Sequence, residues 1–207
     1  MIPLVRERLH EHGPSRLRAG QPADDFTCVS VPRHECDLLR DLLIAERARS
    51  VVEIGLAYGA SALAIGEALA GGRHWVIDPY QDRAYADAGW NLLVEAGLAA
   101  TTTLLREESS AVLPALLRDQ VVADAAFVDG SHRFHEVFVD LYYLRRLVRP
   151  GGLIIVDDDV PPVHAALRYF TTNLGWTDVA VSSPWRCRAL RLPSTLSEPS
   201  YEDFMAF

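Results

Sequence analysis

The segment from Val51 to Gly59, VVEIGLAYG, combines an acidic residue with two glycines at a spacing that suits ligand binding. Gly55 permits a tight turn at the end of an apolar strand, and Gly59 lets the backbone approach a ligand closely. The fingerprint that binds dinucleotides requires a further glycine where Ala57 stands. The carboxylate of Glu53 would also repel a pyrophosphate. The segment therefore favours a ligand with a cationic amino group, although a tight turn with a solvated glutamate is the plainer alternative.

S-adenosylmethionine carries such an amino group and no phosphate, so the pattern favours it over NAD. Asp78 ends the next apolar run, HWVID, about 20 residues further on, where an acid commonly binds ribose hydroxyls in such folds. Asp78 can instead start the Asp-Pro turn that follows it. With Glu53 and Gly55 upstream, the ribose role is the preferred interpretation.

A second group of acids follows two later apolar runs. Asp129 comes after Ala125–Val128, and three aspartates at 157–159 come after Leu153–Val156. If these runs are neighbouring parallel strands, the carboxylates meet at the edge of the sheet where ligands bind. They repel one another unless a cation or protons are present. Mg²⁺ prefers such oxygen ligands, with Ca²⁺ or Mn²⁺ as alternatives. The alternative without a metal is that some of these acids cap helices or face water.

Four segments together resemble class I S-adenosylmethionine-dependent methyltransferases. Within this class they are similar to the small bacterial branch related to catechol O-methyltransferase. The resemblance covers about residues 32–192. It implies a Rossmann-like methyltransferase fold, S-adenosyl-L-methionine as cofactor and methylation of a small-molecule hydroxyl. The segments are Glu53-x-Gly55-x-x-x-Gly59, Asp78-Pro79-Tyr80-Gln81, Val128-Asp129-Gly130-Ser131-His132, and Pro150-Gly151-Gly152 followed by Asp157-Asp158-Asp159.

The resemblance also implies roles for the acids at the strand ends. It places the metal ligands at Asp129, Asp158 and Asp159, the last standing where the family often has asparagine. His132 lies where the catechol enzymes have a lysine that removes the hydroxyl proton. A histidine with a pKa near 6.5 can do this near neutral pH. His132, with Asp129, is therefore the expected catalytic group. It can instead ligate a metal or cap a helix, and His135 and His164 are alternative bases.

The remaining cofactor contacts are also implied by the resemblance. Glu108 and Ser109 follow the third strand, along the expected adenine edge, although helix capping explains Ser109 equally well. The expected cofactor-binding residues are Glu53, Gly55, Tyr58, Gly59, Ser61, Asp78, Pro79, Tyr80, Glu108, Ser109 and Asp129.

Strands and helices must alternate to position these groups. Apolar runs predict strands, and amphipathic runs between them predict helices, an alternation typical of βαβ units with a parallel sheet. The fold class is a doubly wound α/β, mostly parallel seven-stranded sheet with an antiparallel C-terminal hairpin. The predicted strands are Val51–Ile54, Trp75–Ile77, Thr102–Leu105, Ala125–Val128, Leu153–Val156, Val179–Val181 and Arg188–Leu192. The predicted helices are Pro32–Ala48, Ser61–Ala70, Ala86–Ala96, Ala111–Arg118, His135–Val148 and His164–Leu174.

Flanking segments complete the predicted organisation. Residues 1–31 form an irregular arm with one short helix at most, 32–193 the methyltransferase domain and 194–207 a polar, partly aromatic tail. The tail's aromatic side chains favour a homodimer. The acceptor pocket is expected in the arm and in the loop Tyr80–Gly89, whose sequences carry no readable code for the substrate.

Composition limits the partners. The chain has 207 residues, 49% of them hydrophobic, and a formal net charge of -8, which disfavours nucleic acid as partner or methyl acceptor. Its first residues, MIPLVRER, are too short and too charged for a secretory signal, and no apolar run approaches the roughly 20 residues needed to cross a membrane. Three cysteines without a CxxC pair indicate reduced thiols in a cytoplasmic protein and disfavour zinc.

The hypothesis with the most support is metal-assisted O-methylation of a small molecule. One alternative omits the metal and uses His132 as base on a sugar, phenol or amine. Another, of a different class, is an NAD-linked oxidoreductase or a nucleoside-binding module without catalysis. The glycine missing at Ala57 argues against NAD, and the strand-end acids argue against a module without activity.

Overall fold

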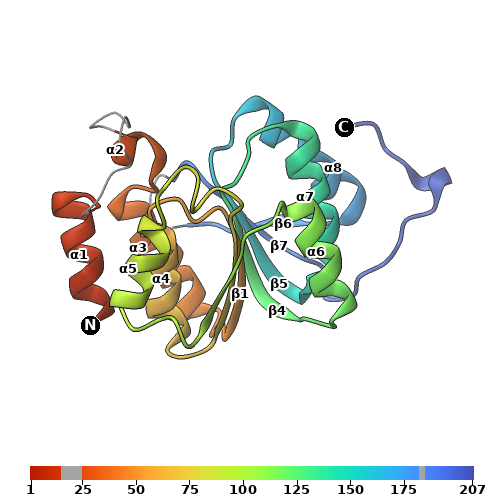
Figure 1. Cartoon of the computed structure of the whole chain (residues 1–207). Coiled ribbons are helices and arrows are strands. Elements are labelled where there is room, and N and C mark those ends of the chain that lie inside the picture. Colours follow the sequence, from red (N-terminus) through yellow and green to blue (C-terminus); the bar gives the residue numbers. More distant parts are fainter. Residues whose placement is uncertain (15–24, 182–184) are drawn as a thin grey trace. The chain divides into compact units, whose positions relative to one another are not determined.

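The computed structural model describes residues 1–14, 25–181 and 185–207. They form two compact units, Met1–Glu108 and Ser109–Phe207 (Figure 1). Three strands lie in the described part of the first unit and four in that of the second. Each unit combines strands with helices packed beside them.

The first unit contains three parallel strands in the order β3-β2-β1. They are β1 (Ser50–Ile54), β2 (Arg73–Ile77) and β3 (Thr102–Leu105), and Trp75 is in register with Val52 and Thr103. The helices that accompany them are α1 (Ile2–His12), α2 (Asp25–Val29), α3 (Arg33–Ala45), α4 (Ala60–Leu69) and α5 (Ala88–Glu95). Helix α4 packs on β1 and β2 and contacts α1, α3 and α5.

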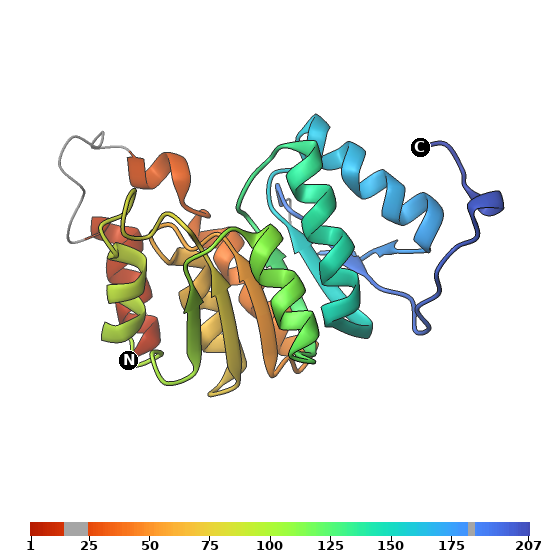
Figure 2. The ribbon, with the colours of Figure 1, turned by 45° about the vertical axis from the view of Figure 1, so that its right-hand side comes forward.

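The second unit contains four strands in the order β4-β5-β7-β6. Strands β4 (Ala123–Val128) and β5 (Val148–Val156) are parallel, whereas β7 (Arg188–Arg191) is antiparallel to both β5 and β6 (Thr177–Asp178). The helices are α6 (Ser109–Arg118), α7 (Phe134–Leu147) and α8 (Pro161–Leu174). Figure 2 shows α7 beside α8, and α7 also packs against β4 and β5.

The predicted alternation is confirmed because the apolar runs are the buried strands. Residues 51–54 of β1 and 152–156 of β5 are all buried, as expected for strands covered on both faces. The helices bury an apolar face of the predicted residues, such as Leu39 and Leu43 in α3. Helix and strand ends differ from the predicted ones by a few residues.

The N-terminal arm is more helical than predicted. An 11-residue helix, α1, precedes α2, and its Val5 and Leu9 are buried. Arg6 fixes α1 through ion pairs to Asp37 on α3 at 2.8 Å and to Glu67 on α4 at 2.9 Å. The charges around Val5 and Leu9 hide this narrow apolar stripe in the sequence, so the prediction of an irregular arm is wrong.

The sixth strand lies earlier in the chain than predicted. Residues 177–178 form β6, and residues 179–181 are not in a strand. The apolar side chain that anchors this region is Trp176, which is 3% exposed and packs against Phe170 with ring centroids 4.7 Å apart. The valines at 179 and 181 led to a strand predicted at Val179–Val181, so the predicted position of this strand is wrong. The antiparallel hairpin itself is confirmed.

The tail is tied to the second unit. Glu198 pairs with Arg145 and Arg146 of α7, and the hydrogen bond from Arg145 holds the pKa of Glu198 below its ordinary value. The side chain of Asn173 on α8 makes two hydrogen bonds with the backbone of Met205, at 3.0 and 2.8 Å. Tyr201 and Phe204 stay exposed.

Within the described residues, each helix is either too short or too polar to span a bilayer.

Candidate active site

The loop between β1 and α4 has the backbone geometry that its glycines predict. Gly55 and Gly59 have φ of 95° and 86°, in the left-handed region that favours glycine. The N–H of Gly55 donates to the carbonyl of Ile77 on β2 at 2.9 Å. A Cβ on Gly59 would meet the carbonyl oxygen of Gly89 at 3.3 Å. Both glycines therefore set the path of the loop and the start of α4.

Asp78 organises this loop from the end of β2. Its Oδ2 accepts hydrogen bonds from the N–H groups of Leu56 at 3.1 Å and Ala57 at 3.0 Å and from Gln81 Nε2 at 2.8 Å. Its Oδ1 accepts from the N–H of Tyr80 at 2.8 Å. The carboxylate is 4% exposed and thus stabilises the loop itself, while its predicted contact with ribose stays a prediction.

Glu53 lies beneath the loop rather than on it. The residue is 0% exposed, and its Oε1 accepts a 2.5 Å hydrogen bond from Ser61 Oγ at the start of α4. Its Oε2 lies 2.9 Å from Nε2 of His74, a residue that is itself 2% exposed. The structure thus brings the predicted residues Glu53 and Ser61 together. The predicted contact between Glu53 and a ligand's amino group is not tested, and His74, which sequence reasoning missed, is the partner of this acid.

Tyr58 connects the loop to the arm. Its hydroxyl donates to Asp25 Oδ2 at 2.5 Å, and its ring meets Phe26 and Tyr85 edge to face at centroid distances of 5.7 and 5.2 Å. Tyr58 is 1% exposed. The arm and the loop after β2, both predicted to contribute to the acceptor pocket, therefore meet at one residue of the glycine loop.

The other predicted cofactor residues of this segment are more accessible. Tyr80 is 50% exposed, and its hydroxyl lies 3.5 Å from Glu108 Oε1. Pro79 is half-buried and Glu108 is exposed. Ser109 is the first residue of α6.

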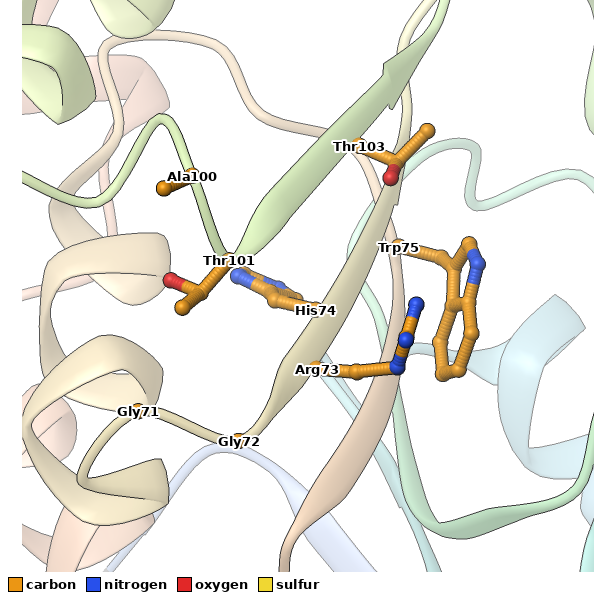
Figure 3. Close-up of a pocket in the computed structure, with 8 residues that line it drawn as sticks. All are labelled: Gly71, Gly72, Arg73, His74, Trp75, Ala100, Thr101 and Thr103. Carbon is orange, nitrogen blue, oxygen red and sulfur yellow. The ribbon is translucent and has the colours of Figure 1, made fainter.

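A cavity of about 200 Å³ in the first unit lies away from these residues (Figure 3). It is at the starting ends of β2 and β3, whereas the glycine loop follows the carboxyl end of β1. None of the predicted site residues lines it. The lining residues are Gly71, Gly72, Arg73, His74, Trp75, Ala100, Thr101 and Thr103.

In the second unit, the predicted acids come from neighbouring strands. Asp129 follows β4 and the aspartates at 157–159 follow β5, and Val128 is in register with Val156. The prediction that these carboxylates share one edge of a sheet is confirmed. Asp157 is held closely, because its N–H donates to the carbonyl of Val128 at 2.9 Å and the residue is 1% exposed.

His132 lies between two of these acids. Its Nε2 is 3.6 Å from Asp158 Oδ2 and 3.9 Å from Asp129 Oδ1. This nitrogen is buried and has no hydrogen-bond partner among the described residues, although the side chain as a whole is 36% exposed. Asp159 pairs instead with Nδ1 of His164 on α8 at 3.1 Å.

Arg186 brings a fixed positive charge to the same acids. Its guanidinium binds Asp157 through Nε at 3.0 Å and Nη2 at 2.6 Å. Its Nε also lies 3.2 Å from Asp158 Oδ1. Sequence reasoning missed this arginine because α8 and β6 lie between it and the aspartates at 157–159 along the chain.

Comparison with known proteins decides the family. A family model described as a methyltransferase domain matches residues 52–159, slightly more than half of the chain. The chain belongs to this methyltransferase family. The prediction of a class I S-adenosylmethionine-dependent methyltransferase is confirmed. None of the curated proteins matches the sequence.

Solved structures show the fold of this methyltransferase. The O-methyltransferase TomG from Streptomyces achromogenes, solved with SAM, is 21% identical, with a TM-score of 0.68 over 94% of this chain and 89% of its own. An O-methyltransferase from Bacillus cereus, solved with SAH, is 17% identical, with a TM-score of 0.67 over 93% and 90%. A putative caffeoyl-CoA O-methyltransferase from Staphylococcus aureus is 14% identical, with a TM-score of 0.68 over 93% and 92%. The predicted fold class, mostly parallel with antiparallel C-terminal strands, is confirmed.

The residues of this methyltransferase fit S-adenosylmethionine better than a phosphate ligand. The segment from Glu53 to Ser61 contains no lysine or arginine that could neutralise a phosphate. Its glycines hold an open backbone turn at the end of β1, and the acid Glu108 stands exposed after β3. These groups suit a cationic nucleoside.

The predicted metal ligands of the methyltransferase do not fit a divalent ion as they are placed. The ligand atoms of Asp129, Asp158 and Asp159 do not all come within 4.8 Å of one another. Each of the latter two already faces a basic side chain, Asp158 facing Arg186 and Asp159 facing His164. An ion at these three residues would require those pairs to open.

Proposed function

We propose that this methyltransferase transfers the methyl group of S-adenosylmethionine to a hydroxyl oxygen of a small molecule, with His132 as the general base. The observation that carries the proposal is the buried Nε2 of His132, which has no hydrogen-bond partner in the described chain and faces two carboxylates. The O-methyltransferases of similar fold, one solved with SAM and another with SAH, support the choice of cofactor and of acceptor atom.

The cofactor would be held in the first unit. The proposed contacts are the glycine loop, with Gly55, Tyr58 and Gly59, the segment from Asp78 to Tyr80, and Glu108. A bound sulfonium is a reactive methyl donor, so the protein's main contribution is alignment of the acceptor oxygen and removal of its proton.

The proton is transferred to His132. As the acceptor oxygen bonds to the methyl carbon and the bond from that carbon to sulfur breaks, the hydroxyl proton passes to Nε2. The resulting imidazolium lies 3.6 Å from Asp158 and 3.9 Å from Asp129, whose negative charges stabilise it. Asp129 and Asp158 therefore assist the base without taking the proton themselves.

The sequence-based hypothesis of a metal at Asp129, Asp158 and Asp159 is not part of this mechanism. The arrangement of these acids favours the metal-independent alternative. A homodimer and a cytoplasmic location stay predictions.

A matched pair of histidine variants tests the proposal. Methyl transfer from labelled S-adenosylmethionine to a panel of phenols, sugars and hydroxy acids is measured for the wild type, His132→Gln and His135→Gln. His135 is on the same segment but 75% of its side chain is exposed. We expect a loss of about 10²–10⁴-fold in kcat for His132→Gln and little change for His135→Gln.

Binding separates the two parts of the proposal. Calorimetric titration with S-adenosylmethionine should give the same affinity for the wild type and His132→Gln. An unchanged kcat in His132→Gln would refute the base, and a wild type that binds no S-adenosylmethionine would refute the cofactor.

A further inference from the structure

A positively charged side chain of the protein binds two of the acids at the end of β5. Asp157 is buried, with a side chain that is 0% exposed, and a carboxylate there is costly unless a positive charge accompanies it. Arg186 binds both of its oxygens, at 3.0 and 2.6 Å, and Cys187 Sγ donates to Oδ1 at 2.8 Å. The two-pronged contact is the strongest geometry available to an arginine and a carboxylate.

The same guanidinium reaches the neighbouring acid. Arg186 Nε is 3.2 Å from Asp158 Oδ1, while the other oxygen of Asp158 is 3.6 Å from Nε2 of His132. Asp158 has a φ of 51°, a conformation that costs free energy for any residue other than glycine. The contacts of its two oxygens with Arg186 and His132 favour this conformation.

An arginine side chain and a divalent ion can each reduce the repulsion between neighbouring carboxylates. Carboxylates that converge at a strand end repel one another until a cation lies among them. A guanidinium stays charged at every physiological pH, and its five N–H groups lie in a fixed plane. Where it already binds Asp157 and Asp158, a metal must displace it and leave a buried acid unpaired.

We propose that Arg186 is the built-in cation of this site. It pairs with Asp157 and Asp158, excludes a divalent metal from them and, through Asp158, positions His132. The exclusion of metal is independent of the reaction, whereas the positioning of His132 rests on the proposed function.

Titration of the metal-free protein with MnCl₂ tests the exclusion. Calorimetry is performed on the wild type, Arg186→Gln and Arg188→Gln. Arg188→Gln is the matched control, because Arg188 is only two residues further along the chain but pairs with Asp178 at 2.8 Å. We expect no saturable binding by the wild type or Arg188→Gln. Arg186→Gln should bind Mn²⁺ at least tenfold more tightly than either. Saturable binding by the wild type that disappears in Asp158→Asn overturns the proposal, whether or not Arg186→Gln folds.

Arg186→Lys tests the positioning role. Lysine keeps the charge but not the planar, two-pronged geometry. We expect Arg186→Gln to lower kcat at least tenfold with an unchanged KM for S-adenosylmethionine, and Arg186→Lys to recover part of kcat while still excluding Mn²⁺. Equal kcat in the wild type and Arg186→Gln overturns the positioning role. A wild type inactive on every acceptor counts against the proposed function instead, because the Mn²⁺ titration needs no turnover.

Discussion

The hydroxyl of Tyr58 donates a 2.5 Å hydrogen bond to Asp25, and this contact joins the glycine loop to the N-terminal arm. The tyrosine is otherwise enclosed by the rings of Phe26 and Tyr85. The position of Tyr58, a residue of the expected cofactor loop, is therefore fixed in part by α2. This helix precedes β1 and is not part of the alternating strands and helices.

Replacement of Tyr58 by phenylalanine should loosen the arm without removing the ring contacts. A hydrogen bond to a charged group contributes about 1.5–3 kcal/mol to the free energy of unfolding. We expect a loss in that range by chemical denaturation and faster hydrogen exchange in residues 25–29. Tyr201→Phe is the control, because Tyr201 is 88% exposed. Equal exchange rates in Tyr58→Phe and the wild type would show that the hydroxyl does not hold the arm.

We expect Glu53 and His74 to be coupled in their contributions to the free energy of unfolding. Removal of one member of a buried polar pair leaves the polar atom of the other unsatisfied, at a cost of about 1–3 kcal/mol. We expect His74→Leu to lower the free energy of unfolding by that amount. The double variant Glu53→Leu with His74→Leu should lose less than the sum of the two single changes, and a double-mutant cycle by urea denaturation measures the difference. Strict additivity would mean that the 2.9 Å approach carries no coupling.

The fold was predictable from local pattern, and the site was predictable only in part. Apolar runs bounded by glycine and charge marked the strands, and Asp129 and Asp157 were expected at one edge because parallel neighbours end on the same side. The contacts of these acids depend on a distant segment. Arg186 reaches them only because β7 returns antiparallel to β5, a pairing that no local pattern in the sequence encodes.

Pairing between distant strands also explains why the surroundings of Glu53 were not predicted. Glu53 was expected to face a ligand, since an acid before a glycine turn looks accessible in sequence. Its side chain is buried because the side chains of a strand alternate between faces, and this face is covered by α4. His74 becomes its partner through the parallel pairing of β1 with β2.

Asp78 should be essential for the shape of the loop. In Asp78→Ala the N–H groups of Leu56 and Ala57 lose their acceptor, at a cost of about 1–3 kcal/mol for each buried donor left unpaired. We expect S-adenosylmethionine to bind at least tenfold more weakly by calorimetry. Asp82→Ala is the control, since Asp82 is exposed and only four residues away. Equal affinities for the two variants would mean that the loop keeps its shape without the carboxylate.

His10 on α1 should make the arm sensitive to mild acid. Burial lowers the pKa of His10 from its ordinary value of 6.5, and the charges of Arg6 and Arg33 lower it further against the opposing effects of Asp37 and Glu7. A histidine with a lower pKa in the folded state takes up its proton more readily in the unfolded state. The free energy of unfolding should therefore be fully retained above about pH 6.5 and fall as the pH drops towards the lower folded pKa.

Replacement of this histidine should remove that part of the acid sensitivity. We expect the difference in the free energy of unfolding between pH 7 and pH 5 to be smaller in His10→Gln than in the wild type. His12→Gln, at the exposed end of the same helix, should match the wild type. The lowered pKa of Asp37 does not interfere, because its contribution is lost only below about pH 3.9, the ordinary pKa of aspartate. The measurement is urea denaturation at half-unit steps of pH, and parallel curves for all three proteins would rule out His10 as the source.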